Sequence, residues 1–259
     1  MRGIKLAGRR QLPLPLQVAS QWGGARKGAG RKPRGRPAMP HDTRAKVDPR
    51  YPLQVTIRAV PGLPSLRSAR VFGALRRTIA RASVDRFRVI HFSIQQDHGH
   101  FIVEGDEARR ARGGMHGLAI RLALAVNRAL GRRKGKVVGD RYHVSPLTTP
   151  RRMRASMVYV LLNFRKHLNA PPGIDPRSSG PHFSGWRRTG RLDSAYVASG
   201  ASAAAGTTPG TGAPTATVEP TTWMATVGWR RAGGPLKVEE RPARSRRRRP
   251  ICRPPPGPT

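Results

Sequence analysis

The stretch Ile90–Glu104, IHFSIQQDHGHFIVE, decides the fold expected for this chain. Apolar residues lie on both sides of a polar centre, Gln95–Asp97, so the stretch predicts two adjacent strands joined by a tight reversal. Side chains alternate faces along a strand, so His98 and His100 point the same way from the second strand. Two imidazoles on one face of a rigid strand are a candidate metal-binding pair.

The segments on either side of this strand pair predict further strands and helices in a definite order along the chain. Residues 53–60 alternate apolar and polar positions, as a half-buried strand does, and Ser65 is suited to cap the amphipathic helix that follows. A second amphipathic helix follows Gly114 and ends at Gly131, and residues 136–145 are a strand or an extended connection. The resulting order predicts an α+β fold of the ferredoxin-like split βαβ type. In this fold an antiparallel sheet carries two helices on one face and leaves the other face free for a ligand.

An extra C-terminal helix is predicted for residues 149–168, TPRRMRASMVYVLLNFRKHL, which begin with a Thr-Pro pair suited to a helix start. At about 100° per residue, its apolar residues form one stripe. Tyr159 and Asn163, spaced i and i+4, fall together away from this stripe, beside Arg152 and Lys166. A tyrosine that only filled the core would be expected on the stripe, so this pair is a candidate for chemistry.

The charge of the chain points to a polyanionic partner. It has 50 Lys and Arg against 13 Asp and Glu, a formal net charge of +37, and this excess favours binding to nucleic-acid phosphates. Residues 1–50 form a basic arm that we expect to be disordered. Its Gly-, Arg- and Pro-rich part (23–37) is either an arm that enters a DNA groove, as AT-hooks do, or a solubilising tail. The DNA-binding candidates in this arm are Arg26, Arg31 and Arg34.

Composition also limits the remaining possibilities. The single cysteine, Cys252, excludes a disulfide framework or a Cys-ligated zinc site within one chain. No apolar run is long enough to cross a membrane, so we expect a cytoplasmic protein. Residues 170–259 are a Pro-, Gly- and Ala-rich linker and extension with an Arg-rich tail. Its Trp-containing segments, 182–187 and 223–231, either pack on the domain at 51–169 or stack on unpaired bases.

The separated candidates fit one reaction. A divalent ion held by His98, His100 and the amide oxygen of Asn163 would keep open positions for a phosphate oxygen, and the Tyr159 phenol could attack that phosphate. The product would be a covalent phosphotyrosine link. Tyr142 is a competing nucleophile, but no ligand candidate lies four residues after it.

These residues resemble a known family. His98-Gly99-His100 is similar to the metal-binding signature of HUH endonucleases, and the pair Tyr159 and Asn163 is similar to the nucleophile helix of their single-tyrosine branch. The REP-associated tyrosine transposases, relatives of insertion-sequence transposases, resemble the chain over about residues 51–168. Asp97 and Gly99 depart from the pattern, because the family commonly has Asn and a bulky apolar residue there.

The resemblance implies a single-strand DNA endonuclease or transposase of the bacterial cytoplasm, associated with the nucleoid. It implies a Mg²⁺ or Mn²⁺ cofactor, single-stranded or hairpin DNA as substrate, and a 5′-phosphotyrosine intermediate. It leaves open both a homodimer and a monomer. The rival hypothesis is a non-catalytic nucleic-acid binder with the same fold, which would need exposed aromatic side chains such as Phe92 and Phe101 on the sheet.

Overall fold

The structure is a computed structural model that describes residues 47–84, 86–168, 171–187 and 216–242, except for the side chains of Lys166 and His167. Arg26, Arg31 and Arg34, the candidates in the basic arm, lie outside the described residues. Among the described helices, none is both long enough and apolar enough to span a membrane.

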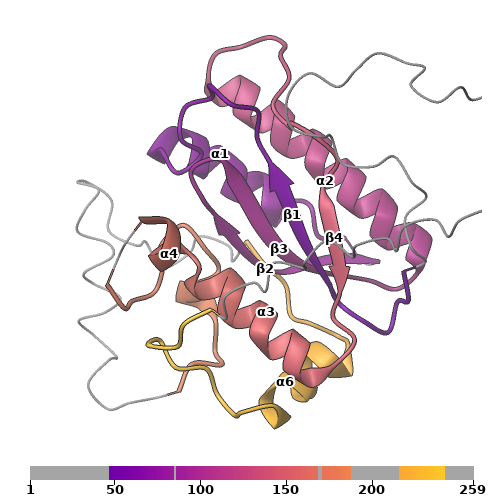
Figure 1. Cartoon of the computed structure of the whole chain (residues 1–259). Helices are drawn as coiled ribbons and strands as arrows, with labels where there is room; N and C mark the ends of the chain where they lie inside the picture. Colours follow the sequence, from indigo (N-terminus) through magenta and orange to yellow (C-terminus); the bar gives the residue numbers. More distant parts are fainter. Residues whose placement is uncertain (1–46, 85, 169–170, 188–215, 243–259) are drawn as a thin grey trace, which may run out of the picture. The chain divides into compact units, whose positions relative to one another are not determined.

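The centre of the fold is a four-stranded antiparallel sheet, which confirms the predicted class (Figure 1). Its strands are β1 (Leu53–Arg58), β2 (Phe87–Ile94), β3 (His98–Gly105) and β4 (His143–Pro146), in the order β2-β3-β1-β4. The alternation seen in the sequence sets the faces. Val55 and Phe101 are buried in the main core on one face of the sheet, whereas their neighbours Thr56 and His100 face the opposite side.

Two helices cover one face of this sheet, as the split βαβ order requires (Figure 1). They are α1 (Ala69–Ala80) and α2 (Ala108–Ala129), and their apolar faces form the main core with β1, β2 and β3. Residues 136–145, expected to be a strand or an extended connection, enter β4 only at His143, and Val138 makes an isolated bridge with Ala59.

Two helix starts differ from the sequence prediction. The N-cap position of α1 is Ser68 and not Ser65, whose hydroxyl instead accepts a hydrogen bond from Arg67 N at 3.2 Å. The helix α2 begins at Ala108 and runs through Gly114. A Cβ atom on Gly114 would lie 2.3 Å from the Phe87 ring, so this glycine serves close packing against β2 and does not mark the helix start.

The predicted C-terminal helix is two helices, α3 (Pro150–Leu162) and α4 (Phe164–Leu168). Thr149 caps α3 by accepting a hydrogen bond from Arg152 N, as expected from the sequence. Asn163 stands at the break between them as the C-cap residue of α3. The helix α3 packs on the sheet face opposite α1 and α2, where its apolar stripe forms a second core with Ile90 and Ile102.

The C-terminal segments complete this second core. They include η1 (Gly180–His182), η2 (Met224–Gly228) and α6 (Trp229–Arg231). Trp229 is 2% exposed and packs in the second core, so this tryptophan follows the packing alternative, whereas Trp223 is 51% exposed.

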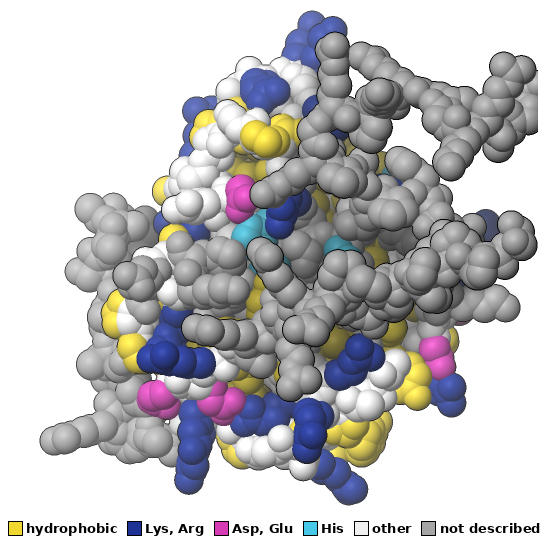
Figure 2. Space-filling view, in the orientation of Figure 1, with side chains coloured by type: hydrophobic (Ala, Val, Ile, Leu, Met, Phe, Trp, Pro, Cys, Tyr) yellow, Lys and Arg dark blue, Asp and Glu magenta, His cyan; other side chains and the backbone are white. Residues whose placement is uncertain are grey.

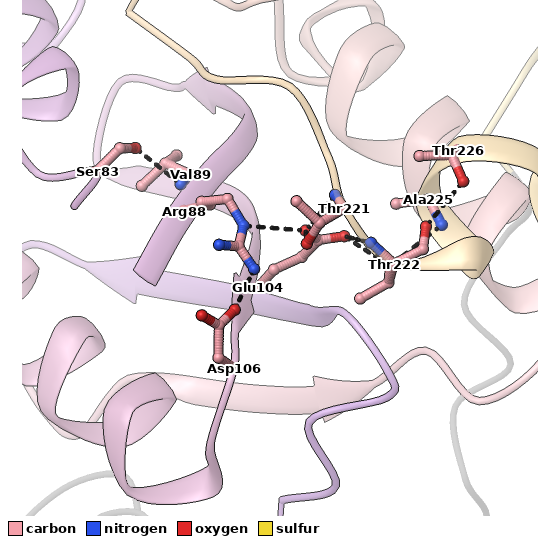
Figure 3. A network of polar contacts seen from close by, with 9 residues as sticks. All are labelled: Ser83, Arg88, Val89, Glu104, Asp106, Thr221, Thr222, Ala225 and Thr226. Carbon is pink, nitrogen blue, oxygen red and sulfur yellow. Dashed lines mark hydrogen bonds and ion pairs between the residues drawn. The ribbon is translucent and has the colours of Figure 1, made fainter. Parts of the chain in front are cut away.

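The buried carboxylate of Glu104 attaches the segment that leads into η2 to the sheet (Figure 3). Glu104 on β3 accepts hydrogen bonds from the backbone N–H and the hydroxyl of both Thr221 and Thr222, at 2.6 to 3.2 Å. Arg88 on β2 reaches the same carboxylate at 3.4 Å. A buried charge is tolerated only when it is paired and hydrogen-bonded in this way, so Glu104 fixes where residues 216–231 dock.

Candidate active site

His98 and His100 project from β3 toward α3, with their ring nitrogens facing each other. Their Nε2 atoms are 3.0 Å apart and their rings meet edge to face. Both side chains are buried, at 6% and 3% exposure. The two-residue spacing on a strand therefore brings the pair together as predicted.

A second hydrogen bond orients each imidazole. The Nδ1 atom of His98 lies 2.6 Å from Asp97 Oδ1, and the Nδ1 atom of His100 lies 3.0 Å from Thr56 Oγ1 on β1. The hydrogen bond to His98 lowers the pKa of the Asp97 carboxyl, which therefore accepts the Nδ1 proton. When Thr56 likewise accepts from His100, both Nε2 atoms present lone pairs to the space between them. Partners of this kind fix the tautomer of metal-ligating histidines.

The helix α3 brings Tyr159 and Asn163 to the same place. The Asn163 Nδ2 atom lies 3.2 Å from His100 Nε2, and the Tyr159 hydroxyl lies 3.4 Å from it. Asn163 is fully buried and its Oδ1 atom has no hydrogen-bond partner. The structure thus gathers the four predicted side chains, although Asn163 is more deeply buried than a residue on a polar helix face would be.

The environment of Tyr159 makes its phenol harder to ionise. Partial burial raises the pKa of Tyr159. The hydrogen bond with Asn163 and the positive charge of Arg58 act in the opposite direction but do not cancel this effect. Arg58 is exposed and stands opposite His98 in the β1–β3 register. Its charge also lowers the pKa of Asp97. The positive charge of Arg58 therefore favours the ionised form of the Tyr159 phenol.

The donor set fits a divalent ion. Two ligands about 2.1 Å from one ion and at right angles to each other are about 3.0 Å apart, which is the Nε2 to Nε2 separation found here. Rotating the Asn163 amide exchanges its nitrogen and its unpaired oxygen, and the oxygen then faces His100. No three His, Cys, Asp or Glu side chains of the described residues form a metal site. The Asn163 amide is therefore the candidate for a third protein ligand beside the two imidazoles.

The other predicted site residues are less closely placed. Arg152 is exposed in the first turn of α3 and lies on the Tyr159 side of that helix, seven residues before it. The Lys166 side chain lies outside the described residues. Tyr142 packs against the core under α1 and α2, on the other side of the sheet from the histidines, so the structure separates it from the candidate metal ligands.

The aromatic side chains required by the rival hypothesis are buried. Phe92 and Phe101 are 2% and 1% exposed and belong to the core under α1 and α2. They are therefore inaccessible for stacking on bases, in contrast to the exposed sheet aromatics of RNA-recognition domains.

Sequence reasoning missed two residues of this site, Thr56 and Arg58. Both lie on the polar face of β1, and the alternation of residues 53–58 identifies that face. The strand register, which pairs Thr56 with His100 and Arg58 with His98, could not be read from alternation alone.

Comparison with known proteins gives limited information. No protein-family model matches the chain, and no curated protein matches it. A similar solved structure is that of a REP-associated tyrosine transposase bound to a REP hairpin, with 17% sequence identity and a TM-score of 0.41. The match covers 50% of this chain and 74% of the transposase chain. This likeness is weak, and the functional proposal rests on the geometry of the site instead.

Proposed function

We propose that the protein is a metal-dependent single-strand DNA endonuclease of the single-tyrosine HUH type, acting as a transposase that cuts and rejoins strands. The observation that carries this proposal is the approach of the Tyr159 hydroxyl and the Asn163 amide to His100 Nε2, which itself faces His98 Nε2. Burying two histidines and an amide whose oxygen has no hydrogen-bond partner costs stability, and such costly arrangements are typical of functional sites.

Each residue has a defined part in this proposal. His98, His100 and Asn163 would hold Mg²⁺ or Mn²⁺, with Asp97 and Thr56 orienting the two imidazoles. Bound there, the ion would withdraw charge from a phosphate oxygen. Tyr159 is the nucleophile, and Arg58 favours the phenolate and attracts the phosphodiester to the rim of the site.

The reaction is a transesterification. The Tyr159 oxygen forms a bond to phosphorus while the bond from phosphorus to the 3′ oxygen breaks. The phenol proton passes to solvent, and the leaving oxygen takes up a proton to become a free 3′-hydroxyl. The 5′-phosphotyrosine link keeps the phosphodiester bond energy, so attack by another 3′-hydroxyl rejoins a strand.

The charge distribution supports DNA as the substrate. In the lower part of Figure 2, where α6 and the start of α3 lie, several Lys and Arg side chains are exposed with a few acidic side chains among them. Because α3 carries Tyr159, a strand attracted to these cations passes near the phenol. Single-stranded or hairpin DNA fits best, since a half-buried phenol reaches a flexible strand more readily than a phosphodiester inside a regular duplex.

The test is formation of a covalent adduct. Full-length protein is incubated with Mn²⁺ or Mg²⁺ and labelled hairpins that carry randomised single-stranded flanks, and adducts that survive denaturation are recovered and sequenced. We expect a metal-dependent adduct that Tyr159→Phe abolishes and Tyr142→Phe leaves intact. A gel shift without an adduct would instead establish the non-catalytic binder.

A further inference from the structure

A cavity of about 300 Å³ lies between α1 and residues 176–182, at the β2 edge of the sheet. It is separate from the candidate active site, because Phe92 lines it on the α1 side whereas His98 and His100 face α3. Three basic side chains and no acidic one are among its described lining residues: Arg76, Arg177 and His182.

Two hydrogen bonds hold the backbone of Arg177 in place. Its N–H donates to the Asp175 carboxylate at 2.9 Å, and its carbonyl accepts from Ile94 N at 2.9 Å. The segment is therefore attached to the end of β2 as well as to a buried carboxylate. A guanidinium that starts from a fixed backbone loses less freedom when a ligand binds.

The Asp175 carboxylate, two residues before Arg177, is already paired with another cation. Arg67 binds both oxygens of Asp175, at 2.7 and 2.8 Å. Among the described residues, no carboxylate forms an ion pair with Arg177, whose guanidinium stacks over the Phe72 ring at 4.8 Å. Burial lowers the pKa of Arg177 and the positive charge of Arg67 lowers it further, whereas the negative charge of Asp175 raises it. An anion in the cavity would relieve both effects.

We propose that this cavity binds a phosphate group, supplied either by the backbone of a nucleic-acid strand or by free phosphate. Arginine presents a planar fork that matches two phosphate oxygens. Arg177 supplies that fork from one wall, and Arg76 and His182 supply further donors. The volume exceeds that of one phosphate and leaves room for an attached sugar. The site does not depend on chemistry at Tyr159.

The test compares single charge removals in the full chain. Arg177→Gln and Arg76→Gln each remove one cation of the cavity, and Arg121→Gln removes an exposed cation of α2 that does not line it. Calorimetry measures binding of inorganic phosphate alone. Fluorescence anisotropy measures binding of a labelled single-stranded oligonucleotide at several salt concentrations. Thermal melting confirms that each variant is folded.

We expect saturable phosphate binding that weakens about tenfold or more in both cavity variants and not in Arg121→Gln. If the nucleic-acid backbone is the source, the cavity variants also reduce the salt dependence of oligonucleotide binding by about one counterion more than Arg121→Gln does. If the cavity variants weaken the binding of inorganic phosphate but not of the oligonucleotide, the site exists and free phosphate is its ligand. Absence of saturable phosphate binding, together with oligonucleotide binding equal to that of Arg121→Gln, would overturn the proposal. Adduct formation at Tyr159 is measured separately and tests the proposed nuclease independently.

Discussion

At the scale of single residues, the candidate site depends on which ring nitrogens carry protons. Asp97 and Thr56 hold the Nδ1 atoms, so the facing Nε2 atoms of His98 and His100 are the positions left for a cation. His-x-His spacing could be recognised in the sequence. Thr56 could not, because its role depends on the register of β1 against β3.

Thr56 offers a direct test of this arrangement. Thr56→Val keeps the shape of the side chain but removes the hydroxyl that bonds to His100 Nδ1 at 3.0 Å. We expect Mn²⁺ affinity, measured by electron paramagnetic resonance without DNA, to fall roughly tenfold to a hundredfold. The control Thr56→Ser retains the hydroxyl and should bind almost as tightly as the wild type. Equal affinity in all three proteins would show that Thr56 does not orient the imidazole.

His91 makes a pH-dependent contribution to stability. It is buried beside Phe183, and burial lowers its pKa from 6.5 to about 4. Its neutral form is favoured in the folded state, so its contribution is fully present above pH 6.5 and is lost as the pH falls toward 4. We expect a loss on the order of 3 kcal/mol over that window. Urea unfolding between pH 4 and 7 measures it, and His91→Leu should have a flatter profile. An equally steep profile in His91→Leu would assign the pH dependence to other groups.

At the scale of elements, hydrophobic periodicity was enough to predict the first three strands and the helices α1, α2 and α3, but not the break before α4 or the short C-terminal helices. The ends of the helices required tertiary information. Gly113 and Gly114 read as a helix boundary in sequence, yet α2 runs through both because Phe87 of β2 occupies the space beside Gly114. The docking of the C-terminal segment also could not be predicted from the sequence, because Glu104 and Thr221 are 117 residues apart in the chain.

The two neighbouring glycines of α2 make a matched pair. Gly113→Ala meets nothing within 4 Å, so the higher helix propensity of alanine should stabilise the protein by about 0.5–1 kcal/mol. Gly114→Ala places its Cβ against the Phe87 ring and should destabilise the protein by about 1–3 kcal/mol. Equilibrium unfolding in urea compares the two variants. Stabilisation by both substitutions would contradict the close packing of α2 on β2.

At the scale of the whole molecule, the sheet separates two environments. One face carries the apolar core under α1 and α2, and the other carries a line of polar side chains on β3: His98, His100 and Glu104. The last of these attaches the C-terminal segment, and the first two meet α3. The net charge of +37 predicted a polyanionic partner, but only the fold indicates which face that partner would meet.

The central claim is that Tyr159 becomes covalently joined to DNA, and peptide mass spectrometry of the trapped adduct tests it most directly. Trypsin places Tyr159 in the peptide 155–165 and Tyr142 in the peptide 142–151. After the DNA is trimmed with nuclease, we expect a nucleotide attached through its 5′ phosphate to Tyr159 in peptide 155–165. A nucleotide on peptide 142–151, or unmodified peptides from a protein that binds the same DNA, would contradict it.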